Sequence, residues 1–303
     1  MQASDFLKLY EAGYRNFKGI NLNGADLSNQ ILVGTDLAES NLAGANLSRA
    51  FLTKADLSGA NLNRANLAYA KLSETRFKQA ELTKANLQGV FWIRSSLEAA
   101  RLSGTNLSHA NLRKSSLDRA NLCSANLSGA NLREASLNGA NLAWANLSGV
   151  RLYGAALDAV QLKGVDFSNA FLNGLTFRGC DLSGVKFTQA RLKGADFTNA
   201  NLVAANFAEA NLQRAKFFCA NLTGADLTAA WVRMADFSQA NLSRSNLSEV
   251  DFLEATLNGA NLAGTERAGT QLPMLPAIEP DVSPYAVSDS HDLLNVPWLR
   301  SAG

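Results

Sequence analysis

The stretch ANLSGANLREASLNGANLAWANLSG, residues 125–149, repeats one five-residue pattern five times. Each unit has a leucine at its centre, Asn or Ser directly before the leucine, and alanine two places before it. A period of five fits neither an α-helix nor a β-strand, which repeat every 3.6 and 2.0 residues. The pattern instead predicts a solenoid whose backbone turns a corner about every five residues, with the leucine and the alanine pointing inward.

The same period continues in both directions along the chain. Between Phe17 and Leu262, 48 of the 50 central positions are Leu or Phe, and the other two are Trp92 and Val232. Alanine occupies 32 of the 50 positions two places before the centre, and no insertion interrupts the pattern. No proline precedes Pro273, which suits a backbone that needs every N–H for bonds between coils. These 246 residues therefore form one continuous repeat region.

These units resemble the pentapeptide-repeat family, whose consensus is A(D/N)Lxx, over roughly residues 15–265. The resemblance implies an all-β fold: a right-handed quadrilateral β-helix with twenty residues per coil, about twelve coils and a length of about 60 Å. The opening FLKLYEAGYRNFKGINL, residues 6–22, is similar to the start of a cyanobacterial family member that regulates heterocyst differentiation. The expected organisation is a capping helix over 1–14, the β-helix over 15–266 and a Pro-rich irregular tail over 267–303.

The N-terminal end of such a rod needs a cap, because its apolar face and strand edges are otherwise unpaired. The segment SDFLKLYEAG places Phe6, Leu7 and Tyr10 at helical spacing. Ser4 is the expected N-cap and Gly13 the expected stop of this helix.

The C-terminal tail contains all five prolines of the chain and breaks the five-residue period at Arg267. We expect it to cap the last coil, to act as a linear motif that binds a partner, or to be disordered. The apolar residues of that motif are Leu293, Leu294, Trp298 and Leu299.

One face of the predicted solenoid differs from the other three. The residues spaced by twenty from Ile31 to Asp251 each lie directly before a centre and form one column. Four members of this column are aromatic, whereas no residue directly before a centre is aromatic in the other three columns. Together with the outward residues after each centre, this face holds eleven Lys or Arg and four acidic residues. The candidate partner-binding residues are Phe51, Phe91, Ile93, Arg94, Arg113, Arg151, Tyr153, Phe171, Arg191, Trp231 and Arg233.

Exposed aromatic residues flanked by arginine are typical of protein interfaces, and they predict a protein partner of unknown identity. Three other interpretations stay open. Long side chains of one coil can cover rings of the next coil, the chain's own tail or a second copy can cover this face, or the repeat has drifted. A homodimer through an end of the rod or through this face is therefore an alternative.

Catalytic motifs are missing from the sequence, so we expect a non-enzymatic protein without a cofactor or a metal. His109 and His291 are isolated, and Cys123, Cys180 and Cys219 have no CxxC spacing, which predicts free thiols. The N-terminus lacks the pattern of a signal peptide, and no apolar run approaches 18 residues. We therefore expect a cytoplasmic protein with no membrane span.

The favoured function is a protein-interaction scaffold or regulator. The family resemblance also suggests a DNA mimic that modulates DNA gyrase, but that mechanism needs a long acidic surface and the net charge here is +2. Binding of nucleic acid or of an anionic surface through the basic face is a further alternative, although a flat β-face offers no groove for a duplex and makes nucleic acid an unlikely partner.

Overall fold

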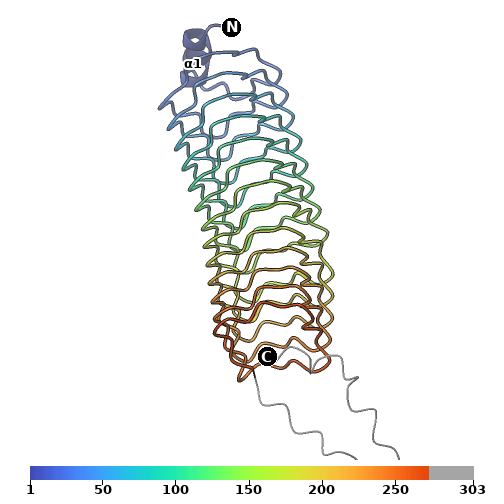
Figure 1. Cartoon of the computed structure of the whole chain (residues 1–303). Coiled ribbons are helices and arrows are strands. Elements are labelled where there is room, and N and C mark those ends of the chain that lie inside the picture. Colours follow the sequence, from blue (N-terminus) through green and yellow to red (C-terminus); the bar gives the residue numbers. More distant parts are fainter. Residues whose placement is uncertain (273–303) are drawn as a thin grey trace, which may run out of the picture.

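The computed structural model describes residues 1–272, which form one straight rod of stacked coils with a helix at its N-terminal end (Figure 1). The tail expectations, including the motif residues Leu293, Leu294, Trp298 and Leu299, lie outside the described residues. None of the helices in the described part is long and apolar enough to span a bilayer.

Helix α1 (Ala3–Glu11) lies on the first coil. The ring of Phe6 is fully buried and meets the ring of Phe17 edge-on, with 4.6 Å between the centroids. The expected N-cap was wrong: Ser4 lies inside the helix, and the N-cap is Gln2, which makes no side-chain capping bond. The apolar contact of Phe6 therefore holds this helix in place more than its cap does.

Isolated parallel bridges between residues twenty positions apart build the rod. They fall into four columns, which begin at Asn16, Asn21, Asp26 and Ile31, and no named strand is present among residues 1–272. The N–H of most central residues donates to the carbonyl nineteen residues ahead, as Leu127 does to Asn146 at 2.7 Å. One coil therefore takes twenty residues.

The register of twenty holds from Asn16 to Gln271 without a slipped residue. The bridges extend five residues past residue 266, where we expected the repeat region to end. The N–H of Gln271 still donates to the carbonyl of Val250 at 3.0 Å, so the backbone bonds outlast the sequence pattern.

The core is a column of central side chains enclosed by the coils. From Leu22 to Phe252 every central residue is buried except Leu157. Phenylalanines take over in the C-terminal half and form two stacks, with 4.7–5.5 Å between successive rings of a stack. Each buried Leu or Phe contributes about 1.5–3 kcal/mol, so stability is spread along the rod.

The corners explain the polar positions of the repeat. The residue two places after a centre has a φ near +60° at every centre from Phe17 to Leu262 except Phe252, and thirty of these residues are not glycine. The Asn or Asp before a centre accepts a hydrogen bond from the N–H two residues on, as Asn146 does from Ser148 at 2.9 Å. These side chains therefore stabilise the turn, which accounts for Asn and Asp at this position.

Two adjacent alanines test this account of the corners. Ala204 is an exposed corner residue with a φ of +54°, whereas Ala205 is fully buried. A left-handed backbone costs a non-glycine residue about 1–2 kcal/mol, so we expect Ala204→Gly to raise the melting temperature. Ala205→Gly should lower it, because the change removes a buried methyl group and loosens the chain. Circular dichroism measures both, and equal shifts of the same sign would contradict the account.

The longest break in the inter-coil bonds, which we call the open seam, lies where residues 152–164 face residues 173–183. A shorter break lies at Val232 and Met234, whose N–H groups make no bond to the next coil. The amide groups of Leu157, Leu162 and Gly164 make no hydrogen bond to the next coil, whereas the equivalent amide groups one coil earlier do. The central residue Leu157 is partly exposed there, as is Cys180. The coils are therefore separated locally on two of the four columns.

Overpacking explains the open seam. Leu175 occupies an inward position that alanine usually fills, and it is the only leucine among those 50 positions. It is buried, as is Phe177, and both stand one coil after smaller counterparts, Ala155 and Leu157. Added volume in a closely packed core forces the backbone to shift.

Hydrogen exchange tests the open seam. The amides of Leu157, Leu162 and Gly164 should exchange faster than those of Leu137, Leu142 and Trp144, which lie one coil earlier and are bonded. Leu175→Ala should restore the protection of the seam, because it removes the excess volume. Equal protection of both sets in the unmodified protein would show that the seam is closed in solution.

Candidate functional site

The column of bridges that begins at Ile31 brings the four outward aromatic residues to one side of the rod. It runs without a gap from Ile31 to Trp231 and includes Phe51, Phe91 and Phe171. We call this side the arginine–aromatic face. It consists of the column from Ile31 to Asp251 and of the two outward residues that come after the core residue directly following each member of that column. The face is therefore a consequence of the twenty-residue coil.

Most of the expected binding residues are accessible on this face. The exposed fraction is 62% for Trp231, 70% for Tyr153, 45% for Phe51 and 41% for Phe91. Ile93 and Phe171 are only partly exposed. The arginines of the set are all exposed: Arg94, Arg113, Arg151, Arg191 and Arg233.

Cations from adjacent coils cover two of the rings. The Arg151 and Arg191 guanidinium groups lie 5.5 Å and 4.4 Å from the ring centroid of Phe171. The Lys71 ammonium lies 3.5 Å from the ring centroid of Phe91. Each cation is twenty residues from its ring, so the register of the coils creates these cation–π contacts. Long side chains therefore cover part of the face, as one alternative interpretation supposed.

The acidic residues of the face leave it basic. Glu134 accepts from Lys114 and Arg113, with N–O distances of 3.3 Å and 3.1 Å, and these bonds lower the pKa of Glu134. Arg233 pairs with Glu254 at 2.7 Å. All these side chains are exposed, so the pairs add little stability. With eleven cations against four acids, the face attracts negative charge.

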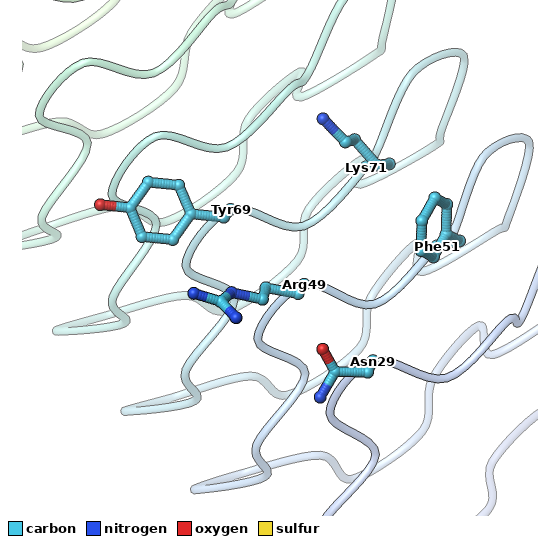
Figure 2. A pocket seen from close by; sticks show the side chains of 5 residues that line it. All are labelled: Asn29, Arg49, Phe51, Tyr69 and Lys71. Carbon is cyan, nitrogen blue, oxygen red and sulfur yellow. The ribbon is translucent and has the colours of Figure 1, made fainter.

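One hollow of about 460 Å³ lies along an edge of the face (Figure 2). Asn29, Arg49 and Tyr69 line one side of it from successive coils, and Phe51 and Lys71 line the other. The sequence analysis missed the first three, because they are corner residues that belong by count to the adjacent side. Each of them lies two residues before a member of the aromatic column, and counting that position as part of the face would have predicted them.

Gly89 leaves room for an aromatic ring beside this hollow. The Tyr69 ring extends over the next coil, where a Cβ on Gly89 would come within 2.6 Å of a ring carbon. Gly89 has a φ of +62°, so it also fills a left-handed corner.

The second hollow, of about 440 Å³, lies at the middle of the arginine–aromatic face. It brings together the expected residues Arg113, Arg151, Tyr153 and Phe171. The other residues that line it were not expected: Arg133, Glu134 and Asn173.

The remaining reactive side chains form no further site in the described part of the chain. Residues 1–272 contain no group of three His, Cys, Asp or Glu side chains placed to hold a metal ion. Cys123, Cys180 and Cys219 are free thiols. Burial raises the pKa of the Cys180 thiol, which disfavours the reactive thiolate.

The fold defines a repeat solenoid, one side of which is the arginine–aromatic face. Family models described as pentapeptide repeats match residues 20–59, 60–91, 93–129, 125–164 and 161–199, and a pentapeptide repeat region model matches residues 191–266. The chain therefore belongs to the pentapeptide-repeat family, whose members are right-handed β-helices.

Several solved structures are similar to this chain. HetL, a pentapeptide repeat protein involved in heterocyst differentiation regulation from the cyanobacterium Nostoc, is 32% identical over 90% of this chain and 98% of its own, with a TM-score of 0.27. A pentapeptide repeat protein of the Arabidopsis thaliana thylakoid lumen is 43% identical over 29% of this chain and 61% of its own, with a TM-score of 0.29. QnrB1, a plasmid-mediated fluoroquinolone resistance protein, is 19% identical over 70% of this chain and 89% of its own, with a TM-score of 0.33. Among curated proteins there is no match.

Tryptophan fluorescence tests the exposure of the face. Trp92 is buried and its indole N–H donates to the Thr75 hydroxyl at 3.1 Å, whereas Trp231 is exposed beside Arg233. Iodide should quench Trp231 strongly, because it is accessible and lies on a basic face. We therefore expect Trp231→Phe to reduce quenching by iodide, and Trp92→Phe to increase the quenched fraction. Unchanged quenching in Trp231→Phe would contradict the exposure of this residue.

Proposed function

We propose that this protein is a non-enzymatic scaffold or regulator that binds a protein partner through the arginine–aromatic face. The observation that carries the proposal is the bridge column that aligns Phe51, Phe91, Phe171 and Trp231 on one side of the rod. Aromatic and arginine side chains supply most of the binding energy in protein interfaces. The C-terminal tail is a second candidate for contacts with the partner.

The proposal includes the finer geometry of the rod. Four bridge columns and a coil of twenty residues support a four-sided cross-section and about twelve coils. At about 4.8 Å per coil, the face is then a straight row in which equivalent side chains recur at that spacing. Such a row suits an elongated partner surface.

The chemistry of the face suits binding rather than catalysis. We place the protein in the cytoplasm. Homodimerisation through an end of the rod, or through the same face, remains an alternative to a different partner. It would require the face to bury its own basic residues against each other, which is costly unless they are paired.

The two alternative functions are less well supported by the surface. A DNA mimic needs a continuous acidic surface, but the column that begins at Asp26 continues mainly with asparagine. In it the Asn66 side chain donates to Asn46 at 3.2 Å, and Lys186 interrupts the row. Nucleic acid would contact the basic face, and the affinity would then fall steeply with salt.

Affinity capture from the source cells tests the proposal. Phe51, Phe91, Phe171 and Trp231 are changed together to asparagine, and we expect the variant to lose a partner that the unmodified protein retains. A matched control changes Trp144 and Phe218, which are exposed on other sides, to asparagine. Equal recovery of the partner by both variants and the unmodified protein would contradict a role for the face.

A further inference from the structure

The hollow at the middle of the arginine–aromatic face holds unpaired positive charge. Arg133 and Arg151 both line it, and neither has an ion pair with an acidic residue among residues 1–272. The one carboxylate in the hollow, Glu134, is already bonded to Arg113 and Lys114. The two free guanidinium groups are therefore available to a ligand, with donors arranged for a carboxylate.

Apolar surface lies beside these charges. The Tyr153 side chain is 70% exposed and the ring of Phe171 also lines the hollow. Arg151 and Arg191 lie over the Phe171 ring, so positive charge and aromatic surface occur side by side here. A ligand with both negative charge and an apolar side chain fits this arrangement better than a simple anion does.

The backbone ladder is weaker beside the hollow than one coil earlier. The hollow lies at the start of the open seam, where the N–H of Gly154 makes no hydrogen bond to the next coil. The Leu152 N–H, which still donates to Phe171, does so at 3.2 Å, longer than the 2.8 Å of Leu132 to Arg151 one coil earlier. The coils are therefore held together by fewer backbone hydrogen bonds beside the hollow than one coil earlier.

We infer that this hollow binds an acidic segment of the protein partner, with its carboxylates on Arg133 and Arg151 and an aromatic side chain against the exposed ring of Tyr153. The inference rests on the proposed function and specifies the chemistry of the partner. Charge complementarity supports it, since the face as a whole has seven more cations than acids.

Fluorescence anisotropy with the full-length protein tests this inference. The probe is a fluorescein-labelled peptide of glutamates with a central phenylalanine. We expect saturable binding, and a loss of affinity of about tenfold or more in the double variant Arg133→Gln with Arg151→Gln, as for removed charge-assisted contacts. The charge-matched control is Arg64→Gln with Arg244→Gln, two exposed arginines on another column. This control should change the affinity by less than about twofold, because screening weakens distant charges.

Two further probes separate the chemistry from bulk charge. Replacing the phenylalanine of the peptide by alanine should weaken binding, and replacing the glutamates by lysines should abolish it. Single-stranded oligothymidylate of equal length should bind more weakly than the acidic peptide. No binding of the peptide, equal losses in the two double variants, or tighter binding of the oligonucleotide would each overturn the inference.

The peptide experiment and the affinity capture can fail independently of each other. If the acidic peptide fails to bind but the four-asparagine variant still loses its partner, the face binds a protein of different chemistry and only the inference is wrong. If both experiments fail, the proposed function is wrong as well. Circular dichroism of the variants excludes misfolding, which we do not expect because both arginines are exposed.

Discussion

The backbone ladder between coils is the constraint on which the rest of the structure depends. Along most of the rod, a central N–H donates to a carbonyl nineteen residues ahead, and the N–H of the residue before it donates twenty-one residues back, as in Asn146 to Ala125 at 2.9 Å. The two bonds together lock the register at twenty. That register aligns the aromatic residues and brings Arg151 and Arg191 to the Phe171 ring. A slip of one residue would point core leucines at solvent.

The core side chains must fit between coils whose spacing is fixed by the backbone hydrogen bonds. At one site a large side chain is accommodated without loss of these bonds, and at another it is not. Trp92 is larger than any other central residue, yet its coil stays bonded, because the inward positions around it hold Thr75 and Ser95 and its indole N–H has a partner. At the open seam the inward position holds the larger residue Leu175, and the hydrogen bonds between the coils are missing. The same seam adjoins the basic hollow, so the departure from ideal packing lies next to the candidate binding site.

The sequence predicted features that depend on side-chain direction alone. Counting residues by five predicts that Phe51 and Trp231 point outward, and counting by twenty predicts that they lie on the same face. It did not predict features that depend on volume or on side-chain conformation across coils. The reach of Tyr69 over Gly89 and the contact of Lys71 with Phe91 are of this kind. The open seam depends on how Leu175 packs on its neighbours, and a pattern of residue types does not contain that information.

Pulsed electron paramagnetic resonance tests the register most directly. Spin labels replace outward residues of one column in a protein whose native cysteines are changed to serine, first as Asn111→Cys with Asn211→Cys and then as Phe51→Cys with Asn211→Cys. The first pair is five coils apart and the second is eight, so at about 4.8 Å per coil we expect label separations of about 24 Å and 38 Å. Separations that do not grow in proportion to the number of coils would contradict a straight column, and with it the arginine–aromatic face.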